Sequence, residues 1–135
     1  MNITTSQAQG RVPVTVVSLK GDLDGSNYQD LIAKAKELYA AGTRHVLLDM
    51  THVPYMSSAG LVALHSIVQV MRGDQPPDPQ QGWATFHAVA RDSSSMQQHV
   101  KLLNLQPKVD RVLQTAGMKE FFEAHTDLAT AVAAF

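Results

Sequence analysis

Two adjacent serines, Ser57 and Ser58, stand where a hydroxyl group could take part in chemistry. They follow the apolar run 46–48 and Asp49 after a short loop, and they precede a segment whose apolar residues recur at helical spacing. This order predicts that both serines lie at the N-terminus of a helix. Unpaired backbone amides and the positive end of the helix dipole favour an anion there. The segment is therefore more typical of a phosphorylation switch than of a catalytic centre.

The position of the serines allows a structural and a regulatory interpretation. A serine at the start of a helix commonly caps it and contributes about 1 kcal/mol. Phosphorylation would instead add roughly 1.5–2 negative charges, and a contact surface around the loop would then lose affinity. The two interpretations are compatible, because a capping hydroxyl on a partly exposed loop stays accessible to a kinase. A hydrolase nucleophile is disfavoured, because MSSAG lacks the first glycine of G-x-S-x-G.

The other polar residues indicate no second chemistry. Aspartates 22, 24 and 49 stand in a turn or at a strand end, where aspartate commonly bonds nearby backbone amides. The histidines do not show metal-ligand spacing; they are residues 45, 52, 65, 87, 99 and 125. Gly21, Gly25 and Gly60 form neither a dinucleotide fingerprint nor a P-loop. The sequence predicts no metal, no cofactor and no enzymatic activity.

Composition places the chain among ordinary globular proteins. Its 135 residues suit one domain, with 44% hydrophobic and 17% charged residues. A net charge of −1 favours neither nucleic-acid binding nor attraction to an anionic membrane. The absence of cysteine excludes disulfides, thiolate metal sites and cysteine catalysis. No signal-peptide pattern or membrane-spanning apolar run is present in the sequence, so we expect a cytoplasmic protein without membrane insertion.

Strand and helix patterns alternate along most of the chain and predict an α/β fold with helices packed on a sheet. The predicted elements are a strand over 12–19, a helix from 28 to a stop at Gly42 with Ser26 or Asn27 as its cap, a strand over 46–50, a helix from 57 or 58 to about 72, a strand over 100–105, a helix from 107 to a stop at Gly117, a short strand over 120–124 and a last helix capped by Thr126.

Two segments fall outside this alternation. Residues 1–11 are polar and predict a flexible N-terminal lead-in. The segment 74–99 begins with DQPPDPQQG, whose proline content disfavours regular structure. Within it, residues 83–91 are compatible with either a short helix or a brief strand. We therefore expect a single domain over 12–135 that carries an insert at 74–99.

These motifs, in this order, resemble the STAS domain family, which is named for sulfate transporters and anti-sigma-factor antagonists. GDLD at 21–24 is similar to the family's G-x-L-D turn. VLLDMTHVPYMSSAGLVAL at 46–64 is similar to its strand, its D-x-(S/T)-x-V loop and its D-S-(S/A)-G-L helix start. VKLLNLQPKVDRVLQTAGM at 100–118 is similar to the next strand and helix. The resemblance leaves the insert unmatched.

The resemblance implies a STAS-like mixed β-sheet with about four α-helices packed mainly on one face. It also implies non-enzymatic docking onto a protein partner, in the antagonist branch an anti-sigma factor with serine-kinase activity. The family's phosphoacceptor falls on Ser58, its turn acid on Asp24, and its helix start on Gly60 and Leu61. The chain departs from the family at Ser57, where an acid usually precedes the phosphoacceptor. The surface that a kinase would contact therefore differs from that of other family members.

Three hypotheses about function follow. The first is a regulatory module that docks a partner through Asp24, Ser57, Ser58, Gly60 and Leu61, with docking weakened by phosphorylation of Ser58. The second is a constitutive scaffold or subunit of a signalling complex or transporter ATPase, which the loss of the usual acid favours. The third is a nucleotide or lipid sensor, which the lack of a phosphate-cradling loop disfavours. The oligomeric state stays open, a homodimer included.

Overall fold

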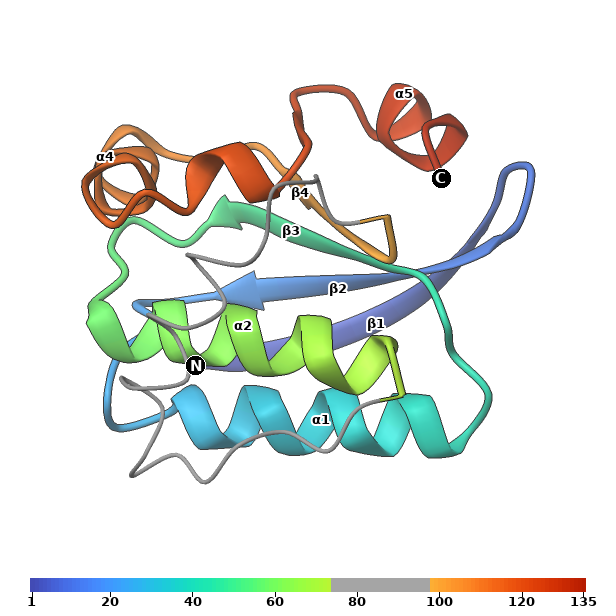
Figure 1. Cartoon of the computed structure of the whole chain (residues 1–135), viewed down its shortest axis with the longest axis horizontal. Helices are drawn as coiled ribbons and strands as arrows, with labels where there is room; N and C mark the ends of the chain where they lie inside the picture. The colour runs from blue at the N-terminus through green and yellow to red at the C-terminus, as the bar shows by residue number, and fades with distance from the viewer. Residues whose placement is uncertain (74–97) are drawn as a thin grey trace.

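The computed structural model describes residues 1–73 and 98–135, which form a sheet with helices on both of its faces (Figure 1). The strands are β1 (Asn2–Gln9), β2 (Pro13–Lys20), β3 (Val46–His52), β4 (Val100–Leu103) and β5 (Ala124–His125). The α-helices are α1 (Tyr28–Ala40), α2 (Ser58–Met71), α4 (Pro107–Thr115) and α5 (Leu128–Ala133), and the 3-10 helix η2 spans Lys119–Phe121. The helix or strand predicted over 83–91 lies outside the described residues.

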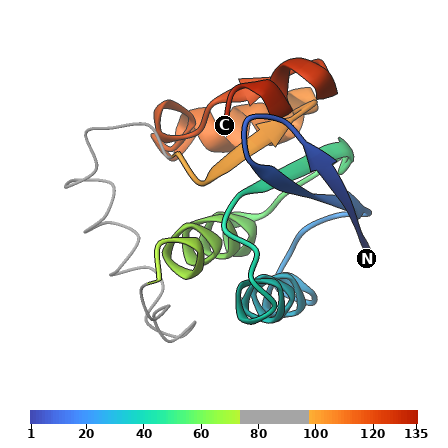
Figure 2. The ribbon, with the colours of Figure 1, turned by 90° about the vertical axis from the view of Figure 1, so that its right-hand side faces the viewer.

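The strands lie in the sheet in their order along the chain. β1 pairs with β2 antiparallel, and β2 to β5 are parallel. Each parallel connection steps to the next strand in the same direction, and because such crossovers are right-handed, their helices lie on one face. Accordingly α1, α2 and α4 share the larger core, and α5 packs on the opposite face (Figure 2). The predicted mixed sheet with helices mainly on one face is confirmed.

The side chains of β2 separate the two cores by their alternation. Val17 and Leu19 point into the larger core, whereas Val14 and Val16 point into the smaller core beneath α5. Its neighbour β3 is buried on both faces over 46–48, which explains why this strand is continuously apolar in the sequence. A sheet covered in this way gives a fixed frame for the loops at the strand ends.

Residues 1–11 are not the flexible lead-in that their polar composition predicts. Residues 2–9 form β1, which pairs with β2 along its whole length. Only Ile3 and Ala8 of this strand pack against the two cores, so its hydrophobic signal in the sequence is weak. Backbone hydrogen bonds to β2 hold it in the sheet, and those bonds do not depend on the polarity of the side chains.

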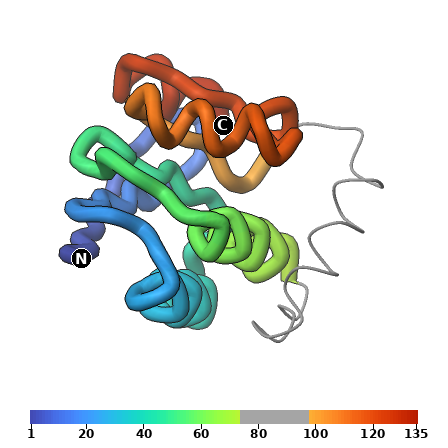
Figure 3. The backbone as a smooth tube through the Cα atoms, turned by 90° about the vertical axis from the view of Figure 1, so that its left-hand side faces the viewer, coloured from blue at the N-terminus to red at the C-terminus, as the bar shows by residue number. Residues whose placement is uncertain are grey.

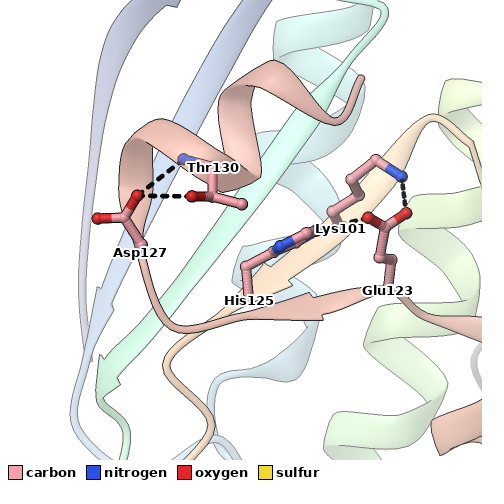
Figure 4. A network of polar contacts seen from close by, with 5 residues as sticks. All are labelled: Lys101, Glu123, His125, Asp127 and Thr130. Atoms are coloured by element: carbon pink, nitrogen blue, oxygen red, sulfur yellow. Dashed lines mark hydrogen bonds and ion pairs between the residues drawn. The ribbon is translucent and has the colours of Figure 1, made fainter.

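The C-terminal elements differ from the sequence prediction in two places. The strand predicted over 120–124 is replaced at its start by η2, and β5 begins only at Ala124. The last helix is capped by Asp127 and not by Thr126. The Asp127 carboxylate accepts hydrogen bonds from the backbone nitrogen and the hydroxyl of Thr130, at 2.9 and 2.8 Å (Figure 4). An acceptor one residue later therefore sets the helix start.

The carboxylate of Glu123 lies between two basic side chains (Figure 4). Its oxygens are 2.6 Å from Lys101 Nζ and 2.7 Å from His125 Nε2. Lys101 is buried, so its charge requires a partner of opposite sign. The hydrogen bond from Lys101 is the main cause that lowers the pKa of the Glu123 carboxyl group. These contacts help to hold the short strand β5 beside β4.

His65 and His45 should make the stability of the fold depend on pH. His65, in the middle of α2, is only 3% exposed, and its Nε2 has no hydrogen-bond partner among the described residues. Burial, and then the charge of Arg72, lowers the pKa of His65. Burial, and then the charge of His99, lowers the pKa of His45. The unfolded chain therefore binds protons on these side chains more readily than the folded one, and stability is lost as pH falls below the unfolded pKa of about 6.5.

We therefore expect the midpoint of urea unfolding to fall when the pH is lowered from about 7.5 to about 5.5. The fall should be smaller in His65→Gln, which cannot take up a proton at this position. His52→Gln is the matched control, because His52 is exposed, and it should keep the full fall. A midpoint that stays constant over this range would contradict the linkage.

A helix that spans a bilayer must be both long and apolar throughout, and no helix within residues 1–73 and 98–135 meets both requirements.

Candidate functional site

The loops that follow β2 and β3 lie side by side at the carboxyl ends of their strands (Figure 3). The backbone nitrogen of Ser57 donates to the carbonyl oxygen of Leu23 at 2.9 Å, and the nitrogen of Leu23 donates to the carbonyl oxygen of Tyr55 at 3.1 Å. A β-bridge between Leu23 and Met56 completes this connection. Asp24 and Ser57 each follow a bridged residue, so the fold brings them to the same surface.

The turn between β2 and α1 is held by the side chains of Asp24 and Asn27. One Asp24 carboxylate oxygen accepts hydrogen bonds from the backbone nitrogen and the hydroxyl of Ser26, at 2.9 and 2.6 Å. Asn27, the N-cap residue of α1, accepts from the nitrogen of Asp24 at 3.0 Å and donates to the carbonyl of Asp22 at 2.7 Å. The hydrogen bonds from Ser26 lower the pKa of the Asp24 carboxyl group. The turn therefore presents a fixed negative charge at neutral pH.

Ser58 is the first residue of α2, and it is exposed. Ser57 occupies the N-cap position, but its side chain makes no capping hydrogen bond. The prediction that one of these serines caps the helix is thus right about the position, which Ser57 occupies, and wrong about a capping hydrogen bond. The first turn of α2 contains no acidic residue, so no side chain within that turn offsets the positive end of the helix dipole. Ser58 is thus an exposed residue at the start of a helix, where backbone amides would stabilise a phosphate.

Gly60 and Leu61 lie behind this surface and not on it. Leu61 is only 4% exposed, and Gly60 is buried. A Cβ atom at Gly60 would stand 2.2 Å from Cγ of Met56 and 3.2 Å from Cδ2 of Leu23. Both are buried in the chain alone, and their contact with a partner stays a prediction. Gly60 allows α2 to begin close against the bridge that joins the two loops, because a larger residue does not fit there.

Tyr55 belongs to the same surface, although the sequence interpretation did not single it out. Its side chain is 45% exposed, and its backbone carbonyl is fixed by the hydrogen bond from Leu23. Exposed tyrosines are common anchors in protein interfaces, because the ring is large, rigid and polar at its tip. The signal in the sequence is an aromatic residue in the loop just before the two serines.

A polar network joins the end of β3 to the loop that follows β4. The Asp49 carboxylate accepts hydrogen bonds from the hydroxyl of Thr51 and, at 3.0 Å, from its backbone nitrogen. The side-chain nitrogen of Asn104 donates to the Thr51 hydroxyl at 3.0 Å, and that of Gln106 donates to the Thr51 carbonyl at 2.7 Å. Asp49 thus bonds a backbone nitrogen two residues on, but Thr51 lies within β3, so the prediction that Asp49 bonds the backbone of the next loop is wrong. Through Asn104 and Gln106, the network links the end of β3 to the loop that follows β4.

The sheet topology bears on the sensor hypothesis. In open α/β sheets, nucleotides bind at the carboxyl edge where the strand order reverses and two neighbouring loops diverge. Here the strand order runs from β1 to β5 without a reversal, so that crevice is not formed. In the described ranges, no group of three histidine, aspartate or glutamate side chains is placed to hold a metal ion. The topology gives no support to a nucleotide site at this edge.

Comparisons with known proteins agree with the motifs at these loops. A family model described as STAS domain matches residues 5–75, which is more than half of the chain. The chain belongs to the STAS domain family. A comparison with curated proteins found no match.

Solved structures of anti-sigma factor antagonists share the fold of this STAS domain. One from Mycobacterium paratuberculosis is 18% identical, with a TM-score of 0.65, and the match covers 98% of this chain and 93% of that chain. A Thermotoga maritima protein described as a candidate antagonist is 13% identical, with a TM-score of 0.68 and coverages of 96% and 90%. SpoIIAA of Bacillus, in its phosphorylated form, is 16% identical, with a TM-score of 0.58 and coverages of 96% and 96%. At these identities the likeness establishes the fold alone.

Proposed function

We propose that this STAS domain is a non-enzymatic cytoplasmic regulator of the anti-sigma factor antagonist type, acting in the control of transcription. In its unmodified form it docks a protein partner, an anti-sigma factor with serine-kinase activity. Docking uses the surface formed by Asp24, Tyr55, Ser57 and Ser58, which we call the docking surface. Phosphorylation of Ser58 by the partner weakens docking. Family membership and the shared fold of the antagonists support this role.

The observation that carries the proposal is the placement of Ser58. Its hydroxyl lies on an exposed first helical residue, next to a loop that presents the ionised Asp24 carboxylate. A phosphate there would add roughly 1.5–2 negative charges to a surface that already carries one. The amides of the helix start would stabilise the modified chain itself. Phosphorylation should therefore change what the surface binds without unfolding the domain.

The constitutive scaffold remains the second candidate, because one observation favours it. Ser57 stands where the family usually has an acid, and the first turn of α2 holds no acid either. A kinase that requires this acid would then not modify Ser58. A scaffold would bind its partner through the same loops, but its affinity would be insensitive to the charge at residue 58. The two functions are separated by the charge series described in the Discussion.

Truncation of Tyr55 should weaken binding of a serine-kinase anti-sigma factor from the same cells by about tenfold to thirtyfold, the range expected for an aromatic interface anchor. The affinity of Tyr55→Ala can be measured by titration calorimetry against that partner. Leu128→Ala is the matched control, because Leu128 is 48% exposed and lies outside the docking surface. It belongs to α5, which packs on the face of the sheet opposite α1 and α2. Equal affinity of Tyr55→Ala and the wild type would remove Tyr55 from the docking surface.

A further inference from the structure

The two edges of the sheet differ in length. β5 forms one edge and has two residues, Ala124–His125, whereas β1 forms the other edge and has eight, Asn2–Gln9 (Figure 2). One side of β1 pairs with β2, and no described strand pairs with its outer side. Since backbone groups alternate in direction along an antiparallel strand, every second residue of β1 points its N–H and C=O groups outward.

The outer edge of β1 lacks the features that usually prevent strand pairing. Proteins block an exposed edge with proline, with charged side chains, with a β-bulge or with a very short strand. The strand NITTSQAQ contains neither proline nor a charged residue. Its pairing with β2 is regular from end to end, whereas the β2–β3 pair contains a register shift between Ser18 and Lys20. The β1 edge is therefore open to a further strand.

We propose that β1 pairs antiparallel with β1 of a second copy of this chain. A two-fold axis perpendicular to the sheet makes the two strands antiparallel. It also keeps the two faces that α1, α2 and α4 cover on the same side of the joined sheet. Residues that face each other must then lie on the same face of the sheet, which restricts the register. The registers that satisfy this condition and overlap most are centred on Thr5 opposite Thr5 and on Ser6 opposite Ser6.

The charge and the exposure of the β1 side chains favour a second copy of this chain as the occupant of this edge. In either register, only the neutral side chains of β1 face one another, so the symmetric pair contains no like-charge contact along the strand. Most of these side chains are also exposed in the single chain, which leaves them free to pack across the new ladder. A charged strand would repel its own copy, whereas this one is self-compatible.

The proposed dimer leaves both docking surfaces accessible. These surfaces lie at the carboxyl end of β2, and antiparallel pairing points the β2 strands of the two copies in opposite directions. The two surfaces therefore lie at opposite ends of the joined sheet. One dimer could bind two partner molecules, and the proposal does not depend on the phosphorylation of Ser58.

Single cysteines test this interface directly, because the chain has no cysteine of its own. Facing residues in an antiparallel pair have Cα atoms about 4.5–5.5 Å apart, within the range of about 4.4–6.8 Å that a disulfide spans. We expect Thr5→Cys or Ser6→Cys, whichever marks the centre, to form a disulfide-linked dimer under mild oxidation at least about tenfold faster than Gln29→Cys. Gln29 is exposed on α1 and serves as the control.

Sedimentation of the unmodified full chain gives the independent readout. The wild type should sediment as a dimer at high micromolar concentration. Of Thr5→Lys and Ser6→Lys, the one at the centre of the pair should sediment as a monomer with an unchanged unfolding midpoint, because its two lysines would face each other at the axis. A wild type that stays monomeric would overturn the proposal. So would a dimer that persists in both Thr5→Lys and Ser6→Lys, or cysteine variants that cross-link no faster than Gln29→Cys.

Discussion

Replacement of Ser58 by aspartate should weaken partner binding by at least about tenfold, which corresponds to about 1.4 kcal/mol, while the domain stays folded. Burial of a charge in an interface without a partner of opposite sign costs several kcal/mol in desolvation, and the new carboxylate would add to the charge of Asp24 on the docking surface. The same substitution places an acid at the first residue of α2, where the helix dipole stabilises it by about 0.3–1 kcal/mol. Affinity should therefore fall while the unfolding midpoint stays constant or rises. Titration calorimetry and urea unfolding measure the two effects separately.

Two further substitutions at Ser58 isolate the contribution of charge. Ser58→Asn has nearly the shape of Ser58→Asp without its charge, and Ser58→Ala removes the hydroxyl alone. Both should retain affinity within about threefold, or about 0.7 kcal/mol, because neither adds a charge to the docking surface. Equal binding by the wild type, Ser58→Ala and Ser58→Asp would contradict the switch and favour the constitutive scaffold.

Replacement of Gly60 by alanine should lower the free energy of unfolding by up to about 2 kcal/mol and weaken partner binding as well. The added Cβ would lie 2.2 Å from Cγ and 2.8 Å from Sδ of Met56, a side chain with no exposed surface. Overpacking of this kind costs about 1–3 kcal/mol, which outweighs the gain of about 1 kcal/mol in helix propensity from glycine to alanine. The start of α2 must move to relieve the contact, and Ser57 and Ser58 would move with it.

Gly25→Ala is the matched control for this substitution. Gly25 lies in the neighbouring turn, and nothing stands within 4 Å of a Cβ built there. Its stability should stay within about 0.5 kcal/mol of the wild type. The double variant Met56→Ala, Gly60→Ala should lose less stability than the sum of the two single variants, because truncation of Met56 vacates the space that the new methyl group needs. Stability of Gly60→Ala equal to that of Gly25→Ala would contradict the packing argument.

The elements with strong periodicity could be predicted from the sequence, and so could the centre of the site. β3 is buried on both faces and α2 begins after a serine pair, so the apolar run and the following helical spacing were sufficient to place Ser58 at the helix start. The turn at Asp24 was also predictable, because aspartate and asparagine bond local backbone groups in such turns.

Features that depend on long-range packing could not be predicted. β1 is held by backbone pairing with β2, which leaves no hydrophobic pattern in its own residues. Gly60 and Leu61 belong to the motif at the helix start, but only the contacts with Met56 and Leu23 show that the start is pressed against the core. The exposure of Tyr55 likewise follows from the way in which two distant loops meet.

The most direct test of the account is incubation of this chain with ATP, Mg²⁺ and a serine-kinase anti-sigma factor from the same cells, followed by intact mass spectrometry of this chain. The account predicts the mass of one added phosphate on the wild type and on Ser57→Ala, and no added mass on Ser58→Ala. The modified wild type should also lose affinity for that partner. An unmodified wild type, or a phosphate that persists in Ser58→Ala, would contradict the claim that the helix start presents residue 58 for modification.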